Sequence, residues 1–248
     1  MVKITSSLQR SPIVILHGWA MDEQNQLKWQ PFTEFLEKEG WVVKFLPIPG
    51  LSSALDKVWQ LNDFVNWVHQ QVDGLPKVIL VGHSFGGQLA VRFTSIFPEK
   101  VDRLILIDPS GIRPFTFKAR LKRKVFGTAA QVGKVLFPLE IGRVVLHKLA
   151  REKDYLQASP TLRKTMQNVL ADEIKADFPR ITVPTCIIWG EDDTATPVSH
   201  AQLFSAGIAN SQLHFVQGAR HSPQFTHVEQ TAKLVLSFLD QTSVEHYA

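Results

Sequence analysis

The chain has 248 residues, of which 44% are hydrophobic and 20% charged, and its formal net charge is +4. This composition fits one large soluble α/β domain with a sizeable core. The longest apolar runs are strand-sized and the first twelve residues lack the apolar stretch of a secretory signal, so we expect no membrane span and a cytoplasmic location. The single cysteine, Cys186, excludes an internal disulfide and a thiolate metal cluster.

Short apolar runs alternate with helical periodicity along the chain. The predicted strands, in chain order, are Ile13–Leu16, Trp41–Leu46, a strand from Val78, Arg103–Ile107, Thr185–Trp189 and Gln212–Val216. Between the first three strands lie two predicted helices, one carrying Trp29, Phe32, Phe35 and Leu36 and the other carrying Leu61, Phe64, Val65, Val68 and Val72. A further helix follows the strand from Val78 and runs to about Phe97, and the last helix is Val228–Leu239. Continuous rather than alternating apolar runs predict a mainly parallel sheet of about six to seven strands with helices on both faces.

The segment GHSFG at residues 82–86 joins a predicted strand to a predicted helix. A serine hydroxyl attacks a substrate only when a base takes its proton, so a nucleophilic serine must protrude where a histidine can reach it. A sharp strand–turn–helix bend achieves this, and small residues two positions before and after the serine relieve the crowding. The pattern is typical of such a nucleophile elbow around Ser84, although an ordinary glycine-rich turn also fits it.

Polar residues just after strand ends matter most, because parallel α/β sheets bind ligands beyond the carboxyl ends of their strands. Besides Ser84, three such places follow predicted strands: HGWA at 17–20, EDD at 191–193 and ARHS at 219–222. Nucleophile, acid and histidine thus occur in the chain order Ser…Asp…His, each in a loop after a different strand. This order is more specific than any single motif and predicts a Ser-His-Asp site.

Taken together, these motifs resemble the α/β-hydrolase family, in its esterase-like group that carries a cap domain. The matching stretches are HG at 17–18, GHSFG at 82–86, FPEKVDRLILID at 97–108, WGEDDTATP at 189–197 and GARHSP at 218–223. The resemblance covers roughly residues 13–111 and 183–240. It implies an α/β-hydrolase core formed by residues 1–111 and 179–248, with residues 112–178 in the position of a helical cap insert.

The resemblance also implies roles for individual residues. Ser84 is the expected nucleophile and His221 the expected base. Asp193 with Pro197 fits the family's spacing for the acid, while Asp192, which is out by one position, and Asp108, where some relatives keep their acid, are the alternatives. The expected oxyanion hole consists of two backbone N–H groups, those of Trp19 and Phe85.

Two departures from the family pattern affect these expectations. Only twelve residues precede Ile13, too few for the usual antiparallel hairpin, so we expect that hairpin to be missing or reduced to one short strand such as Val2–Thr5. The loop FLPIPGLSSA at 45–54 lacks the aspartate that relatives often carry there, so the resemblance does not imply a substrate preference. The other histidines, His17 and His83 among them, are expected to be structural or surface residues, and their spacing predicts no metal site.

The middle of the chain is strongly basic. Fifteen Lys and Arg residues and six Asp and Glu residues lie between Ile112 and Arg180, so the insert has a net charge near +9 and the remainder near −5. A solvated helical surface explains this charge, and attraction of an anionic substrate, an acidic partner or a membrane surface is the functional alternative. Nothing resembles a nucleic-acid-binding module.

The expected function is that of a serine hydrolase that cleaves small-molecule carboxylic esters through an acyl-enzyme intermediate, with no cofactor and no metal. Thioesterase, lactonase and carbon–carbon bond hydrolase activities use the same three residues and stay open as alternatives. A dehalogenase is disfavoured because its nucleophile is an aspartate where Ser84 stands. From a different class, a ligand receptor of the same fold is the alternative.

Overall fold

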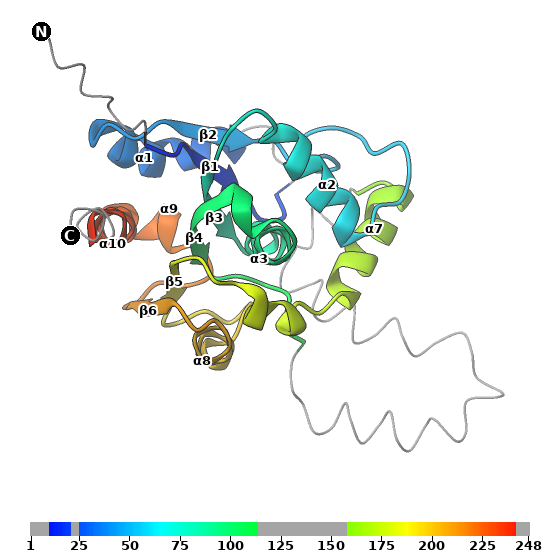
Figure 1. Cartoon of the computed structure of the whole chain (residues 1–248). Coiled ribbons are helices and arrows are strands. Elements are labelled where there is room, and N and C mark those ends of the chain that lie inside the picture. The colour runs from blue at the N-terminus through cyan, green and yellow to red at the C-terminus, as the bar shows by residue number, and fades with distance from the viewer. Residues whose placement is uncertain (1–9, 21–24, 114–157, 242–248) are drawn as a thin grey trace, which may run out of the picture.

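The computed structural model describes residues 10–20, 25–113 and 158–241. Within them, six parallel strands form one sheet in the order β2-β1-β3-β4-β5-β6 (Figure 1). The strands are β1 (Ile13–Leu16), β2 (Val43–Leu46), β3 (Val78–His83), β4 (Val101–Ile107), β5 (Thr185–Gly190) and β6 (Ser211–Val216). The predicted parallel α/β sheet is therefore confirmed.

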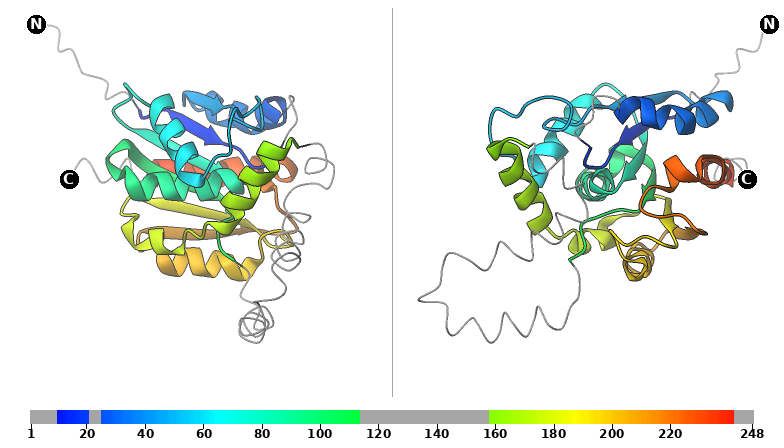
Figure 2. Two further views of the ribbon diagram at one scale, coloured as in Figure 1. Left: turned by 90° about the vertical axis from the view of Figure 1, so that its right-hand side faces the viewer. Right: turned by 180° about the vertical axis from the view of Figure 1, so that it is seen from behind.

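Helices alternate with these strands along the chain. They are α1 (Asn25–Lys38), α2 (Leu61–Gln71), α3 (Phe85–Ile96), α7 (Pro160–Ala171), α8 (Val198–Gly207), α9 (Pro223–Thr226) and α10 (Val228–Gln241), with short 3₁₀ turns η1 (Pro98–Lys100) and η2 (Lys175–Arg180). Figure 1 shows α1 and α10 on one side of the sheet and α2, α3 and α8 on the other, and Figure 2 shows the same layers from two further directions. The fold is thus a three-layer α/β arrangement.

The sequence of the strands explains why both faces are covered. Successive side chains in a strand point to opposite faces, and in β1 all four of them are fully buried. Val14 and Leu16 join the core under α2 and α3, whereas Ile13 and Ile15 join the core under α1 and α10. Apolar runs without alternation therefore predicted the sandwiched sheet correctly.

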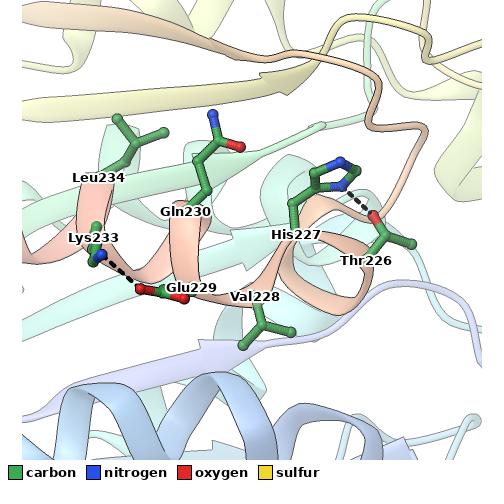
Figure 3. A pocket seen from close by; sticks show the side chains of 7 residues that line it. All are labelled: Thr226, His227, Val228, Glu229, Gln230, Lys233 and Leu234. Atoms are coloured by element: carbon green, nitrogen blue, oxygen red, sulfur yellow. Dashed lines mark hydrogen bonds and ion pairs between the residues drawn. The ribbon is translucent and has the colours of Figure 1, made fainter.

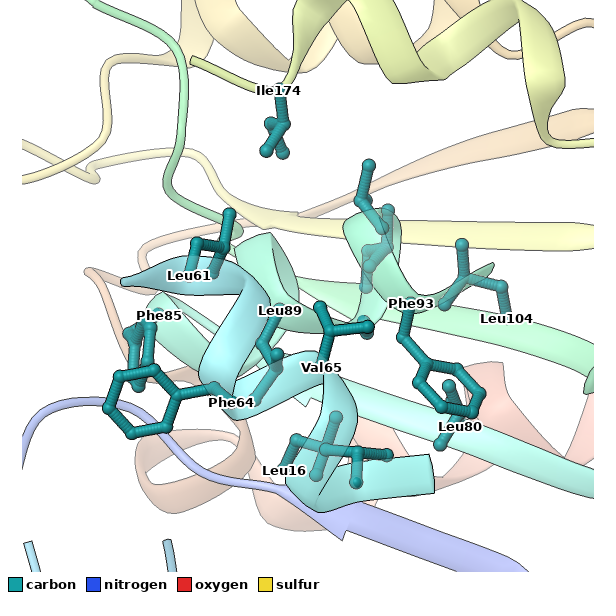
Figure 4. Packing of buried hydrophobic residues seen from close by; sticks show 14 of the residues in the cluster. Leu16, Leu61, Phe64, Val65, Leu80, Phe85, Leu89, Phe93, Leu104 and Ile174 are labelled. Atoms are coloured by element: carbon teal, nitrogen blue, oxygen red, sulfur yellow. The ribbon is translucent and has the colours of Figure 1, made fainter. Parts of the chain in front are cut away.

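The larger core lies between the sheet and the helices α2 and α3 (Figure 4). Phe64 and Val65 of α2 face Phe85, Leu89 and Phe93 of α3 there, and all five side chains are buried. This core holds the start of α3 in place, because Phe85, its first residue, is fully buried. The core therefore fixes the position of the helix that follows Ser84.

Helix α7 lies inside the stretch predicted as a cap insert, yet it packs against this same core through Leu162, Met166 and Val169. Its C-terminal carbonyl groups are bound by the buried side chain of Gln88 in α3, which donates to the carbonyl oxygens of Val169 (3.0 Å) and Asp172 (2.8 Å). Residues 158–178 are thus attached to α3, the helix that follows Ser84.

Arg92 makes a second attachment one turn along α3. Its guanidinium contacts Asp177 at 2.6 Å and Asp172 at 2.9 Å. Burial lowers the pKa of Arg92, but the hydrogen bonds and charges of the two carboxylates outweigh burial and raise it overall. The cation therefore stays charged between them.

Several sequence predictions fall outside the described residues. The basic stretch at 114–157 and the short strand predicted at Val2–Thr5 belong to these, so both stay predictions. The boundaries of the described strands differ from the predicted ones by up to two residues, as at β2 and β4. Among the described helices, none combines the length and apolarity needed to cross a membrane.

Candidate active site

Ser84 sits at the sharp bend between β3 and α3. Its backbone has φ 52° and ψ −115°, a conformation that a residue with a side chain rarely adopts. Two neighbouring glycines make the bend possible. A Cβ atom at Gly82 would lie 2.6 Å from the carbonyl oxygen of Gly86, and one at Gly86 would overlap the carbonyl group of Leu16. The glycine positions of the GHSFG motif are therefore required by close backbone approach.

The Ser84 hydroxyl lies against the ring of His221. The distance between Ser84 Oγ and His221 Nε2 is 2.9 Å, although the residues are 137 positions apart in the chain. His221 belongs to the loop between β6 and α9, and Ser84 follows β3. Both loops leave the carboxyl ends of parallel strands, which is why they meet at one edge of the sheet.

The other ring nitrogen of His221 faces a carboxylate. Nδ1 lies 2.7 Å from Oδ2 of Asp193, in the loop after β5. The arrangement defines the tautomer: Nδ1–H donates to Asp193, and Nε2 accepts the hydrogen bond from the Ser84 hydroxyl. A neutral imidazole in this tautomer is ready to take a proton from the serine.

Asp193 is fixed by its own loop. Its Oδ1 accepts hydrogen bonds from the backbone N–H groups of Ala195 (2.7 Å) and Thr196 (3.0 Å), and its Oδ2 accepts one from the Thr196 hydroxyl. Burial raises the pKa of Asp193, but the hydrogen bond and charge of His221 and the bonds from Thr196 outweigh burial, so the pKa lies below its usual value. Asp193 is thus an anion that orients the histidine.

The two alternative acids lie elsewhere. Asp192 is exposed, and its backbone N–H donates to the carbonyl oxygen of Ala219 at 2.9 Å. Asp108 is fully buried at the end of β4, and its Oδ1 accepts a hydrogen bond from the N–H of Gly190 at 2.8 Å. Among the three predicted acids, Asp193 is the one whose carboxylate is hydrogen-bonded to His221.

Trp19 and Phe85, the residues predicted to supply oxyanion-hole N–H groups, lie face to face. Their rings stack with centroids 4.3 Å apart. Phe85 is the first residue of α3, so no preceding turn of the helix offers an acceptor for its backbone N–H group. Stacking of the two rings fixes the loop after β1 against the start of α3, on the side of the sheet where Ser84 emerges.

Two buried histidines, His17 and His83, support these loops through hydrogen bonds to the backbone. His17 Nδ1 lies 2.8 Å from the carbonyl oxygen of Gly18, and its Nε2 accepts a hydrogen bond from the N–H of Ile48 at 3.1 Å. Burial lowers the pKa of His17 to about 4. His83 Nε2 lies 2.7 Å from the carbonyl oxygen of His221, and burial, reinforced by the nearby His221, lowers the pKa of His83 to about 3. Both rings are therefore neutral near pH 7.

Sequence reasoning missed the part that Thr196 takes in this site. Its hydroxyl contacts Asp193 Oδ2 and lies 3.3 Å from His221 Nδ1. The signal was present in the sequence, because an aspartate followed three residues later by threonine favours a local side-chain-to-backbone turn.

One group of side chains within the described part of the chain has the composition of a metal site. Ligand atoms of His83, Asp108 and His221 lie within 4.8 Å of one another. A cation there would have to displace the hydrogen bonds of His221 to Ser84 and Asp193 and that of His83 to the backbone. The donor set therefore fits a hydrogen-bonded site better than a metal centre.

A surface depression of about 650 Å³ lies elsewhere, over the join of α9 and α10 (Figure 3). It is open, and its lining includes an ion pair between Lys233 and Glu229. The residues that line it are Thr226, His227, Val228, Glu229, Gln230, Lys233 and Leu234. The lining does not include Ser84, Asp193 or His221.

A parallel α/β sheet with a serine elbow and a histidine–carboxylate pair at its carboxyl edge defines the class of α/β hydrolases. Comparison with known proteins agrees: the model of the alpha/beta hydrolase fold family matches residues 11–228. The chain belongs to this family.

Individual relatives include hydrolases of different substrates. Monoacylglycerol lipase ABHD6 of Homo sapiens is 29% identical over 92% of this chain and 74% of its own length. The 2-hydroxy-6-oxononadienedioate/2-hydroxy-6-oxononatrienedioate hydrolase 1 of Pseudomonas putida is 25% identical over 93% of this chain and 88% of its own length.

Solved structures share the fold. The alpha/beta hydrolase MGS-MChE2, from the metagenome of sediments of the Mar Chica lagoon in Morocco, has a TM-score of 0.69 at 23% identity, over 94% of this chain and 92% of its own. The meta-cleavage product hydrolase CumD of Pseudomonas fluorescens IP01 has a TM-score of 0.67 at 19% identity, with the same coverage of the two chains. These structures therefore show that the chain has the α/β-hydrolase fold.

Proposed function

We propose that this protein is a serine esterase that cleaves carboxylic esters of small molecules through an acyl-enzyme intermediate. The observation that carries the proposal is the continuous chain of hydrogen bonds from Ser84 Oγ through His221 to Asp193, with heavy-atom distances of 2.9 and 2.7 Å. These distances lie within the range in which a base removes the proton of a nucleophile.

The proposed reaction has two halves. In the first, His221 Nε2 takes the proton of Ser84 as Oγ attacks the ester carbonyl carbon, and then gives this proton to the departing alcohol oxygen. In the second, a water molecule gives a proton to the same nitrogen and attacks the acyl carbon, and Ser84 regains its proton as the acid leaves. Asp193 stays ionised throughout and stabilises the imidazolium in each half.

Two backbone N–H groups complete the proposed site. Those of Phe85 and Trp19 are assigned to the negative charge that develops on the carbonyl oxygen. The stacked rings support this assignment, because they hold the two segments together before any substrate arrives. Such a preorganised pair of donors stabilises the transition state without a metal or a cofactor.

Ester hydrolysis is preferred over the other reactions because of the relatives. A monoacylglycerol lipase at 29% identity supports an ester as the substrate. The dienedioate hydrolase at 25% identity supports hydrolysis of a carbon–carbon bond as a second candidate function. A thioester or a lactone would use the same residues, and so would a receptor of this fold that binds a ligand without turnover.

A fluorophosphonate probe tests the nucleophile first. We expect rapid covalent labelling of the parent protein and none of Ser84→Ala, checked by intact-protein mass spectrometry. Absence of labelling in folded parent protein would favour a binding protein.

The substrate class is tested next. A chain-length series of nitrophenyl esters should be hydrolysed with a higher kcat/KM than an acyl thioester, a lactone or a 2-hydroxy-6-oxo dienoate acid. A dienoate turned over faster than every ester would replace the ester proposal by carbon–carbon bond hydrolysis.

A further inference from the structure

Asp108 is a buried carboxyl group to which the proposed reaction gives no role. It follows the last residue of β4 and has φ 42°, which aspartate tolerates better than most residues. Its side chain is fully buried. Its backbone N–H donates to Ile188 of β5 at 3.0 Å, and the N–H of Ser84 donates to the preceding residue, Ile107, at 3.1 Å. Asp108 therefore lies in the backbone frame that carries the nucleophile.

The hydrogen bonds of Asp108 are incomplete for an anion. Oδ1 accepts from the N–H of Gly190, whereas Oδ2 is buried and has no partner that donates to it. An ionised carboxylate buried with a single donor is strongly disfavoured. A protonated carboxyl group, in contrast, needs an acceptor for its hydroxyl rather than further donors.

The titratable groups around Asp108 come from three other elements. His83 ends β3 and is neutral, because its pKa is about 3. His221, in the loop before α9, is hydrogen-bonded to Ser84 and Asp193. Asp193, in the loop after β5, lies near enough for its charge and side-chain hydrogen bonding to raise the pKa of Asp108. None of these groups brings a permanent positive charge to Asp108.

The contact between the two carboxyl groups decides where a proton resides. Two adjacent carboxylates repel each other, and a shared proton removes the repulsion. Asp193 is the one stabilised as an anion, since it accepts from Thr196 and His221. Burial raises the pKa of Asp108 well above its usual value, and the charge and contact of Asp193 raise it further against the opposing hydrogen bond from Gly190.

We propose that Asp108 is a positioning residue: a buried, neutral carboxylic acid whose Oδ2 hydroxyl donates a hydrogen bond to the Asp193 carboxylate. Its Oδ1 is fixed by Gly190, so the donated bond links the ends of β4 and β5. Asp108 then acts on the reaction through Asp193, by holding that carboxylate in line with His221 Nδ1. Its effect on turnover rests on the proposed esterase function, but its protonation does not.

Infrared spectroscopy tests the protonation directly. The protein would be labelled with ¹³C-aspartate, and its spectrum at pH 7 compared with that of Asp108→Asn, a variant that preserves the shape of a neutral acid. A carboxylic-acid C=O stretch that is present in the parent and shifted by the label, and lost in Asp108→Asn, supports the proposal. A parent spectrum without that band overturns it, whether or not the protein turns over esters.

Activity tests the positioning. Asp108→Asn keeps a donor toward Asp193 and an acceptor for Gly190, so we expect it to retain at least about a third of the parent kcat. Asp108→Gly suits the positive φ but removes the donor, so kcat should fall about tenfold or more with KM within about twofold. The acidic limb of the kcat/KM profile should move in Asp108→Gly and stay in place in Asp108→Asn. Equal losses in the two variants would contradict the proposal, and so would full activity in Asp108→Gly.

Discussion

His83 and His221 are joined by a hydrogen bond that runs from the side chain of one to the backbone of the other. His83 Nε2–H donates to the carbonyl oxygen of His221 at 2.7 Å. Because His83 directly precedes Ser84, this one bond ties the backbone next to Ser84 to the backbone of His221. The distance between Ser84 Oγ and His221 Nε2 therefore depends on a group that takes no part in proton transfer.

Replacing His83 should loosen the pairing of nucleophile and base. In His83→Leu we expect kcat to fall about tenfold or more with little change in KM, because misplacement of a catalytic group is costly. The amide of His83→Gln can still donate to the His221 carbonyl oxygen, so that variant should recover most of the loss. Steady-state kinetics on one ester checks this, and equal kcat values in the two variants would show that the bond does not matter.

The neutral, buried His17 and His83 should make the fold sensitive to acid. Their native pKa values, about 4 and about 3, lie below the value near 6.5 expected in the unfolded chain. Between these values the unfolded state binds more protons, so stability is complete above pH 6.5 and falls as the pH decreases toward 4. Each residue adds up to about 1.4 kcal/mol per pH unit to this slope.

Chemical denaturation at several pH values measures that slope. His83→Gln removes one of these two rings and should therefore flatten the slope of stability against pH. An unfolding free energy of the parent that does not change between pH 6.5 and 4 would refute the linkage.

Ser84 should be needed for turnover and unfavourable for stability. Ser84→Ala should reduce ester hydrolysis about 10³-fold or more, and adding His221→Ala should cost little further, since the two act as a unit. Ser84→Gly should be more stable than Ser84→Ala by about 1 kcal/mol, because glycine adopts φ 52° without strain. Kinetics and denaturant unfolding measure the two effects, and retention of a tenth of the activity in Ser84→Ala would exclude the proposed mechanism.

Asp193 and its neighbour Asp192 form a matched pair for testing the acid. Asp193→Asn should lower kcat about 10³-fold or more, because an amide leaves the imidazole in the wrong tautomer. Asp192→Asn changes an exposed carboxylate of the same loop and should keep kcat within about twofold. The reverse order of severity in kcat measurements would place the acid at Asp192.

Arg92 should matter for stability. The side chains of Arg92 and Asp177 are mostly shielded from water, with 15% and 9% exposed. Arg92→Met therefore leaves the shielded Asp177 carboxylate without its ion-pair partner. We expect a loss of about 1–3 kcal/mol in the free energy of unfolding. Lys233→Met removes an exposed ion pair with Glu229, 69% and 64% exposed, and should have little effect. Equal losses of unfolding free energy for Arg92→Met and Lys233→Met in urea denaturation would contradict the prediction that the shielded ion pair matters more.

The strands were predictable because each one is marked by a local run of apolar residues. The run IVIL at Ile13–Leu16 is buried on both faces, as its uninterrupted apolar residues predict. The grouping of Ser84, Asp193 and His221 was predictable for a similar reason, since each follows a strand and parallel strands end at one edge. Their catalytic roles stay a prediction.

Contacts between distant segments were not predictable in the same way. Gln88 binds the carbonyl oxygen of Asp172 across 84 positions, and no local pattern marks either residue as a partner. The sequence offered Asp108 as an alternative acid, because the burial that raises its pKa cannot be inferred from local sequence. Such features depend on which backbone groups meet in space.

The attachment of α7 to α3 determines how an insert could be exchanged between relatives. A chimera joined near residues 112 and 159 would keep α7, the bonds of Gln88 to Val169 and Asp172, and the bond from the N–H of Ile174 to the carbonyl oxygen of Gly111. A junction at residue 178 would replace all of them and uncover the apolar surface beneath α7. Grafting experiments on this chain should therefore treat residues 159–178 as part of the recipient scaffold.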